Sequence, residues 1–286
     1  MALPPWLVSR PGTAILYALG FRSFSGKILL CKPLPDVVVS RQIDAVIFDL
    51  DDTLLDWSQP SENWTDFTRP MVDNVYDYLR TQGYALPGRD AFFQQLSNQI
   101  DQVWAEAKKS WAGAQFGDAL QRTFANCGLP VEDLDLDEIL RVYDWQPMEG
   151  VEPFPEAIPV LEALRARGYK LGLITNSFFP MWMRDIELDA YRMRHYFDAR
   201  ITSGDTGYMK PHPAIYQRAL NLLHTEPQRA VFVGDRPEND IAGANETGLI
   251  SVLMSPPHLN RDLKGVVPHY TIQSLSELLP ILEQLG

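Results

Sequence analysis

The sequence predicts an α/β protein with a three-layer α/β/α core around a parallel sheet and a helical domain inserted into that core. Residues 45–48 form an apolar run that leads directly into carboxylates, which is typical of a parallel strand buried on both faces. After residue 150, strand and helix patterns alternate, which favours a parallel sheet with helices on both faces. Between these regions the periodicity is helical. Ligands bind at the carboxyl ends of strands in such sheets, so we expect a site at that edge.

The first strand ends in an acidic loop over residues 49–56. Asp49 and Asp51 are two residues apart, so one lies at the strand tip while the other projects from the turn toward the same ligand. One carboxylate can then attack while the other moves protons, and their crowded charge favours a hard divalent cation such as Mg²⁺. On its own such a loop is more often a solvated turn, so its assignment depends on the rest of the chain. The remaining polar residues are interpreted as turn, capping or loop-fixing residues: Asp52, Thr53 and Asp56.

Length and composition restrict the class of protein. A chain of 286 residues with 45% hydrophobic side chains can bury a large core and still carry an insert or a second domain. The formal charge of −12 argues against a nucleic-acid partner. Cys31 and Cys127 lack any disulfide or metal-binding spacing, which fits a reducing compartment. No apolar run reaches the roughly 18 residues of a transmembrane helix, so we expect a soluble, cytoplasmic protein without a membrane partner. The oligomeric state is not predicted.

Residues 1–40 differ from the rest and are interpreted as an N-terminal extension. They carry four basic residues against a single acid, Asp36, and contain five prolines. The apolar part is short and has no convincing cleavage site, which argues against a secretory signal, whereas the shortage of acids leaves organellar import as an alternative to a cytoplasmic location. The favoured interpretation is a segment that is partly disordered or packs on the core through apolar side chains: Trp6, Leu7, Leu16, Tyr17 and Phe21.

Residues 57–150 predict a compact helical bundle, which we interpret as a cap over the acidic loop. Its expected helices cover 64–80, 91–109, 117–126 and 136–143. Residues 41–56 and 151–286 then form the α/β core. The expected helices of the second part cover 155–167, 213–223, 240–247 and 276–285, and its expected strands cover 170–174, 200–202, 230–233 and 250–254.

Polar residues follow two further predicted strands and one loop of this core. Thr175 and Asn176 end one strand, Asp235 ends another, and Lys210 lies between a glycine and prolines at the start of a helix. Each feature alone is more often a helix cap, a turn or a solvated lysine. Together with the acidic loop, they supply a nucleophile, a proton carrier, a hydroxyl donor, a fixed cation and a metal ligand. This combination is what displacement at a phosphoryl group requires.

These four segments, in this order, resemble the four motifs of the haloacid dehalogenase (HAD) superfamily of phosphohydrolases. The match covers residues 44–56 and 151–256, and residues 1–40 lie outside it. The resemblance implies a Rossmann-like core, with residues 57–150 at the position of the family's type 1 cap. The matching motifs are Asp49-x-Asp51-x-Thr53, Thr175-Asn176, Lys210-Pro211 and Gly234-Asp235-Arg236-Pro237-Glu238-Asn239-Asp240.

The resemblance also implies roles for single residues in the chemistry. Asp49 would attack phosphorus and form an aspartyl-phosphate, which water then hydrolyses. Asp51 would protonate the leaving alkoxide and later activate that water. Thr175 and the backbone amide of Asn176 would bind the phosphoryl oxygens. Lys210 would neutralise charge between the phosphate and the nucleophile.

A second set of roles concerns the metal. By the same resemblance, Asp49, Asp235 and the backbone carbonyl of Asp51 would hold Mg²⁺. Asp240 would support the metal directly or through water. Mg²⁺ suits such a site because it prefers carboxylate oxygens and retains several waters.

The resemblance implies a Mg²⁺-dependent phosphatase that hydrolyses a small phosphorylated metabolite, a phosphate monoester. Asp51 supports this, because the dehalogenase and phosphonate-cleaving branches of the superfamily do not hold an acid at that position. Three alternatives stay open: a sugar phosphomutase of the same superfamily, a catalytically silent HAD-fold binding protein, and a phospho-receiver domain. The substrate is not predicted.

Specificity is expected to lie in the cap. Five aromatic residues there could stack a sugar, flavin or nucleobase ring, although aromatic side chains at helical spacing are more often bundle core. Lys108 and Lys109 could meet a second anionic group, although adjacent lysines more often form a solvated face. The aromatic candidates are Trp57, Trp64, Trp104, Trp111 and Phe116.

Overall fold

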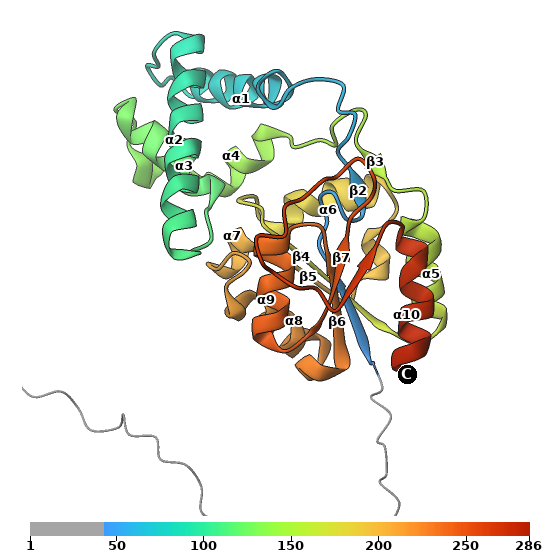
Figure 1. Ribbon diagram of the computed structural model, residues 1–286. Coiled ribbons are helices and arrows are strands. Elements are labelled where there is room, and N and C mark those ends of the chain that lie inside the picture. Colours follow the sequence, from blue (N-terminus) through green and yellow to red (C-terminus); the bar gives the residue numbers. More distant parts are fainter. Residues whose placement is uncertain (1–42) are drawn as a thin grey trace, which may run out of the picture. The chain divides into compact units, whose positions relative to one another are not determined.

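The computed structural model describes residues 43–286 (Figure 1). The predicted N-terminal extension over residues 1–40, with its apolar side chains and Cys31, lies outside the described residues. Among residues 43–286, no helix is both long enough and apolar enough to cross a membrane.

The central sheet contains six parallel strands: β1 (Ala45–Phe48), β4 (Lys170–Thr175), β5 (Ala199–Thr202), β6 (Ala230–Gly234), β7 (Ile250–Met254) and β8 (Tyr270–Ile272). Their spatial order is β5-β4-β1-β6-β7-β8. Strand β1 is therefore internal, pairs with β4 on one side and β6 on the other, and is fully buried. The acidic loop that follows β1 consequently lies between the loops that follow β4 and β6.

Helices cover both faces of the sheet (Figure 1). One face packs in an apolar cluster with α5 (Ala157–Ala166), α6 (Met181–Ala190) and α10 (Leu278–Leu285), and the other with α8 (Pro213–Leu223) and α9 (Ala242–Thr247). Alternate side chains of β1 enter the two clusters, because successive side chains of a strand point to opposite faces. Val46 and Phe48 belong to the first cluster, and Ala45 and Ile47 belong to the second. The predicted three-layer α/β/α core is confirmed.

Four helices lie between the two-residue strands β2 (Leu55–Asp56) and β3 (Glu152–Pro153), which pair antiparallel and bring the two ends of the helical segment together. The first helix is capped by Asn63, whose side chain accepts a hydrogen bond from the N–H of Asp66, and its apolar side chains recur at helical spacing. The assignment of residues 57–150 as a separate cap domain stays a prediction. The helices are α1 (Trp64–Thr81), α2 (Arg89–Ser110), α3 (Phe116–Asn126) and α4 (Leu136–Tyr143).

The loop between α2 and α3 contacts the edge of the sheet where β4 and β5 end. The N–H of Gly113 donates to the carbonyl of Gly207 at 2.8 Å. The N–H of Phe116 donates to the carbonyl of Phe178 at 2.9 Å. Gly113 has no room for a side chain, because a Cβ would lie 2.0 Å from the carbonyl oxygen of Ser203. These backbone contacts hold the helical segment against the strand ends that carry the candidate site.

The sequence pattern missed three elements of the core: α6, β8 and the four-residue helix α7 (Ser203–Thr206). In α6 the hydrophobic periodicity is masked, because buried apolar residues alternate with buried charged ones: Arg184, Asp185 and Glu187. Strand β8 is only three residues long, and Ile272 is its one buried residue. By contrast, α8 and β7 begin and end at the predicted residues.

Candidate active site

Asp49 directly follows the internal strand β1 and is buried at the carboxyl end of the sheet. Its backbone N–H donates to the carbonyl of Val233 at 2.9 Å, which extends the contact between β1 and β6. Burial raises the pKa of the Asp49 carboxyl to about 7, although Lys210 acts in the opposite direction. The Asp49 carboxylate is thus held rigidly at the strand end and depends on positive charge beside it.

Lys210 supplies that charge from a fully buried position. Its Nζ lies 2.6 Å from Oδ1 of Asp49 and 2.7 Å from Oδ1 of Asp240, and it donates to the carbonyl of Ile174 at 3.0 Å. Burial lowers the pKa of Lys210, but Asp240 and Asp49 outweigh this effect and raise it. The ammonium group is therefore charged and held between two acids.

Asn176 holds the backbone of Lys210 in place. The Oδ1 of Asn176 accepts from the N–H of Lys210 at 2.7 Å, and its Nδ2 donates to the carbonyl of Lys210 at 3.0 Å. The sequence placed Asn176 at the end of β4 but assigned only its backbone amide a role. The paired side-chain bonds are an additional finding.

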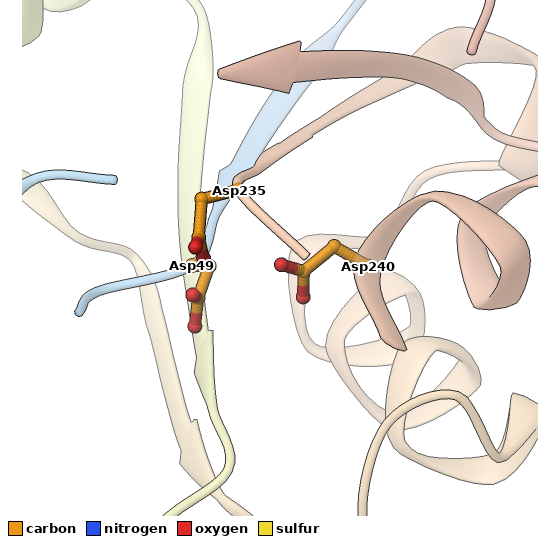
Figure 2. A group of neighbouring side chains, drawn as sticks. All are labelled: Asp49, Asp235 and Asp240. Atoms are coloured by element: carbon orange, nitrogen blue, oxygen red, sulfur yellow. The ribbon is translucent and has the colours of Figure 1, made fainter. Parts of the chain in front are cut away.

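Three carboxylates meet at the edge of the sheet (Figure 2). Asp49 follows β1, Asp235 follows β6, and Asp240 lies in the π-helical turn Pro237–Ile241 that precedes α9. Each offers one oxygen, and these three oxygens lie within 4.8 Å of one another. Gly234 permits this arrangement, since a Cβ there would lie 2.5 Å from the Cβ of Asp240.

The donor set fits a hard divalent cation. Asp235 is fully buried, and its Oδ1 accepts no hydrogen bond within the described residues. Burial raises the pKa of Asp235 to about 8, and Asp240 and Asp49 add to the rise. Its Oδ2 contacts Arg261, which also donates to Asp52 at 2.8 Å. An unpartnered buried carboxylate oxygen beside two further carboxylates suits the coordination of a hard divalent cation such as Mg²⁺.

Asp51 lies beside this group, but its carboxylate is not part of it. Its Oδ1 accepts from the indole Nε1 of Trp57 at 3.0 Å and from Arg184 at 2.7 Å. The hydroxyl of Thr175 lies 3.4 Å from its other oxygen, Oδ2. The acid is therefore oriented from several elements. The role of its backbone carbonyl as a metal ligand stays a prediction.

Arg184 and Glu187 form a buried pair behind Asp51. The Nε of Arg184 lies 2.8 Å from Oε2 of Glu187, and both side chains are almost inaccessible to solvent. Burial raises the pKa of Glu187 to about 7, while Arg184 acts to lower it. The sequence analysis missed both residues, although charged residues on the apolar side of a helix are a signal that could have identified them.

A small cavity joins these groups. Its volume is about 70 Å³, well above the roughly 10–15 Å³ that one water needs, so it has room for a group of several heavy atoms. Asp235 is the one predicted site residue that does not line this cavity. It belongs to the site because its carboxylate lies in the group formed with Asp49 and Asp240. The lining residues are Asp49, Asp51, Thr175, Asn176, Lys210, Arg236, Asn239 and Asp240.

Residues of the acidic loop outside this cavity have structural roles. Asp56 accepts a hydrogen bond from the N–H of Ser58 at 2.8 Å, in agreement with the predicted turn role. Asp52 pairs with Arg261 at 2.8 Å. The Thr53 hydroxyl is buried without a hydrogen-bond partner within residues 43–286, so the predicted hydrogen bond that fixes the loop is not found.

The aromatic candidates of the helical segment divide into three groups. Trp57, Trp64 and Trp104 line a second cavity next to the first. Phe116 is buried in the core, in agreement with the alternative that such residues pack inside the bundle. Trp111 is 38% exposed and lines neither cavity. Lys108 and Lys109 are exposed, as expected for a solvated face.

Comparison with known proteins identifies relatives of this chain. A glyceraldehyde 3-phosphate phosphatase from Methanopyrus kandleri is 29% identical over 253 residues, which cover 85% of this chain and 99% of that protein. The structure of a 2-haloacid dehalogenase from Pseudomonas syringae pv. Tomato DC3000 aligns with a TM-score of 0.58 at 26% identity, covering 86% of this chain and all of that one. A HAD phosphatase from Thermococcus onnurineus aligns with a TM-score of 0.52 at 26% identity, covering 84% of this chain and 98% of that one.

The family match covers most of the chain. Residues 43–248 match the haloacid dehalogenase-like hydrolases, a range that includes every predicted site residue. The two structural neighbours align with this fold over 84–86% of the chain. The chain therefore belongs to the haloacid dehalogenase-like hydrolases.

Proposed function

We propose that this protein is a Mg²⁺-dependent phosphatase that hydrolyses a small phosphate monoester through an aspartyl-phosphate on Asp49. The observation that carries the proposal is the 70 Å³ cavity, which brings Asp49, Asp51, Thr175 and Lys210 together around a space of suitable size for a phosphoryl group. A nucleophilic carboxylate, a carboxylic acid, a hydroxyl group and the ammonium group of Lys210 would then all face a phosphoryl group bound in the cavity.

In the first step a carboxylate oxygen of Asp49 attacks phosphorus, and the bond from phosphorus to the ester oxygen breaks. Asp51 gives its proton to the departing alkoxide, which leaves as the alcohol. Lys210 faces the phosphoryl oxygens with positive charge, and Thr175 and the backbone N–H of Asn176 bind them. Positioning and charge neutralisation account for most of catalysis in phosphoryl transfer.

In the second step a water molecule attacks phosphorus of the aspartyl-phosphate and gives a proton to Asp51. Inorganic phosphate leaves, Asp49 is regenerated as a carboxylate, and Asp51 is again protonated. The hydrogen bonds donated by Arg184 and Trp57 would keep the carboxylate of Asp51 in one orientation through both steps. One acid thus acts first as general acid and then as general base.

Asp49, Asp235 and Asp240 would hold the Mg²⁺, with the backbone carbonyl of Asp51. When bound, the cation supplies positive charge that offsets the charge of the phosphoryl oxygens. The unpartnered Oδ1 of Asp235 and the raised pKa of Asp235 support a cation at this position. We further propose that residues 57–150 act as a cap that shields the acyl phosphate from bulk water and admits the hydrolytic water molecule.

Two features support phosphate esters as substrates rather than haloacids. A departing halide needs no proton, whereas an alkoxide does, and Asp51 is placed to supply one. The M. kandleri relative, which aligns over 99% of its own length, is a phosphatase.

The test is release of inorganic phosphate from a panel of phosphomonoesters, measured with Mg²⁺ and with EDTA. We expect Mg²⁺-dependent release, and an acid-quenched enzyme that carries a phosphoryl group sensitive to hydroxylamine, as an acyl phosphate is. Asp49→Asn should lose turnover and labelling while keeping the wild-type circular dichroism spectrum. Wild-type turnover in Asp49→Asn, or no phosphate release by folded wild-type protein, would refute the proposal.

A further inference from the structure

A larger cavity opens beside the phosphate-sized one and shares part of its lining. Its volume is about 320 Å³, within the range of about 300–1,000 Å³ for small-molecule sites. Asp51, Asn176 and Arg236 line both cavities. Since Asp51 would protonate the leaving oxygen, the alcohol part of a bound ester would extend into this second space, which we name the aromatic cavity.

Aromatic rings dominate the aromatic cavity. Trp57, Trp64 and Trp104 come from the helical segment, whereas Phe178 and Phe179 come from the loop after β4. Neighbouring rings hold the walls in place: Trp104 packs edge-on against Phe178, with ring centroids 5.6 Å apart and planes at 88°. Trp64 remains 40% exposed, so part of its ring is free to contact a ligand.

Several polar groups that line the aromatic cavity are already engaged in hydrogen bonds within the protein. Both ends of the Asn176 amide bind the backbone of Lys210, and the Ser177 hydroxyl accepts from the N–H of Phe179. The hydroxyl groups of a polyhydroxylated alcohol would therefore find fewer hydrogen-bond partners here than in water, which costs binding energy. An apolar ring has no such penalty.

Charge in the aromatic cavity is also largely compensated. Arg184 pairs with Asp51 and Glu187, and Asp52 pairs with Arg261. Within the described part of the chain, the guanidinium of Arg236 makes no ion pair or hydrogen bond, and Arg236 lies where the two cavities meet. The Arg236 guanidinium can therefore face the phosphoryl end of the substrate, and most of the residues that line only the aromatic cavity are aromatic.

We propose that the substrate is a phosphate monoester of an alcohol that carries an aromatic ring on a short chain. The ring contacts Trp64, Trp104 and Phe178, and the phosphoryl group occupies the smaller cavity. This inference rests on the proposed phosphatase function and narrows its substrate class. The reaction is hydrolysis: the bond between phosphorus and the alkyl oxygen breaks, water supplies the new oxygen on phosphorus, and the arylalkyl alcohol leaves with a proton.

The test compares esters whose leaving oxygen is chemically alike: propyl phosphate, 3-phenylpropyl phosphate and 3-cyclohexylpropyl phosphate. Burial of the phenyl ring should raise kcat/KM over propyl phosphate by about 10- to 100-fold. The phenyl ester should also exceed the cyclohexyl ester, because aromatic rings gain edge and face contacts with other rings. Equal or better turnover of the cyclohexyl ester would overturn the aromatic assignment.

Variants test whether the aromatic residues of this cavity cause the preference for the phenyl ester. Trp104→Ala should reduce the ratio of kcat/KM for 3-phenylpropyl phosphate to kcat/KM for propyl phosphate to about threefold or less. If this variant does not fold, Trp64→Ala, at a partly exposed position, should reduce the same ratio. Trp182→Ala is the matched control, because Trp182 is 42% exposed on α6 and lines neither cavity, so its ratio should stay within about twofold of wild type.

The outcomes separate this inference from the proposed function. If propyl phosphate is hydrolysed and the phenyl ester is no better, the ring specificity is wrong while the phosphatase proposal stands. If no phosphomonoester releases phosphate, the phosphatase proposal itself fails. An unchanged ratio in folded Trp104→Ala and Trp64→Ala would also overturn the ring site.

Discussion

Replacement of Asp235 by asparagine is expected to stabilise the metal-free protein and to remove its response to Mg²⁺. Asp235 is fully buried beside Asp49 and Asp240. Within the described residues, Lys210 pairs with Asp49 and Asp240, and Arg261 contacts Asp235. Asparagine keeps the shape of the side chain and removes one negative charge. The change therefore relieves repulsion in the absence of a cation and also removes a ligand.

The size and pH dependence follow from the raised pKa of Asp235, about 8 against an ordinary 3.8. The unfolded chain releases this proton at lower pH, so the wild type loses stability as pH rises from 3.8 to about 8 and has no penalty below 3.8. At about 1.4 kcal/mol for each pKa unit, the charge term is on the order of 5 kcal/mol at the upper end. This term already includes the attraction of Arg261. The buried amide of asparagine, left without all its hydrogen-bond partners, offsets part of the gain, and we expect a net gain of about 1–3 kcal/mol.

The assay is urea unfolding at about pH 8, with EDTA and with Mg²⁺. At a concentration of about 100 Kd, Mg²⁺ should stabilise the wild type by about 2.7 kcal/mol, whereas Asp235→Asn should gain less than about 1 kcal/mol. Asp101→Asn is the matched control, since it removes the same charge from an exposed position of α2. It should leave stability and the Mg²⁺ response unchanged.

Two results would refute this reasoning. One is a metal-free Asp235→Asn protein that is less stable than the wild type at about pH 8. The other is an equal Mg²⁺ response in both proteins, which would place the cation elsewhere.

Three further predictions concern the side chains around the nucleophile. Asp51→Asn should lower kcat by about 100-fold or more, because general acid–base catalysis contributes about 10²–10⁴-fold. Mg²⁺ should still raise the Tm of this variant. A kcat equal to that of the wild type would exclude Asp51 as the general acid. Asn176→Ala removes two hydrogen bonds to Lys210, so urea unfolding should show a loss of about 2 kcal/mol together with a lower kcat, and full stability would contradict this role. Glu187 has a pKa of about 7 against 4.5 in the unfolded chain, so the wild type should lose stability relative to Glu187→Gln as pH rises from 4.5 to about 7. A Tm difference between these two proteins that stays constant over this range would contradict the assignment.

The fold and the positions of the chemically reactive residues could be predicted from local sequence. Asp49, Thr175 and Asp235 each lie at the end of a buried apolar run, and parallel strands place such ends at one edge. This regularity predicted neighbours that are far apart in the chain, such as Asp49 and Asp235, whose carboxylates lie in one group. Lys210, which lies 2.6 Å from Asp49, follows no strand, and its place in the site was implied by the resemblance to the family motifs.

The partners that orient these residues could not be predicted in the same way. Arg184 reaches Asp51 across 133 positions, and Arg261 reaches Asp235 from a loop without a recognisable pattern. Such contacts depend on the packing of one element against another, for which the sequence has no periodic signal. Helix α6 itself was missed because its buried charged residues interrupt the apolar spacing.

The aromatic residues of the helical segment show the same division. Their helical spacing determined that they lie on helices or beside them, but Phe116 is buried in the core while Trp64 and Trp104 line a cavity. Spacing specifies a face of a helix, and only the packing of that helix against the loop after β4 decides whether the face meets other side chains or an open space. The sequence by itself therefore determined the fold and the place of the proposed reaction centre, because buried apolar runs and the residues that end them are local patterns. The tertiary structure decided which side chains orient that centre and which surround the proposed alcohol site.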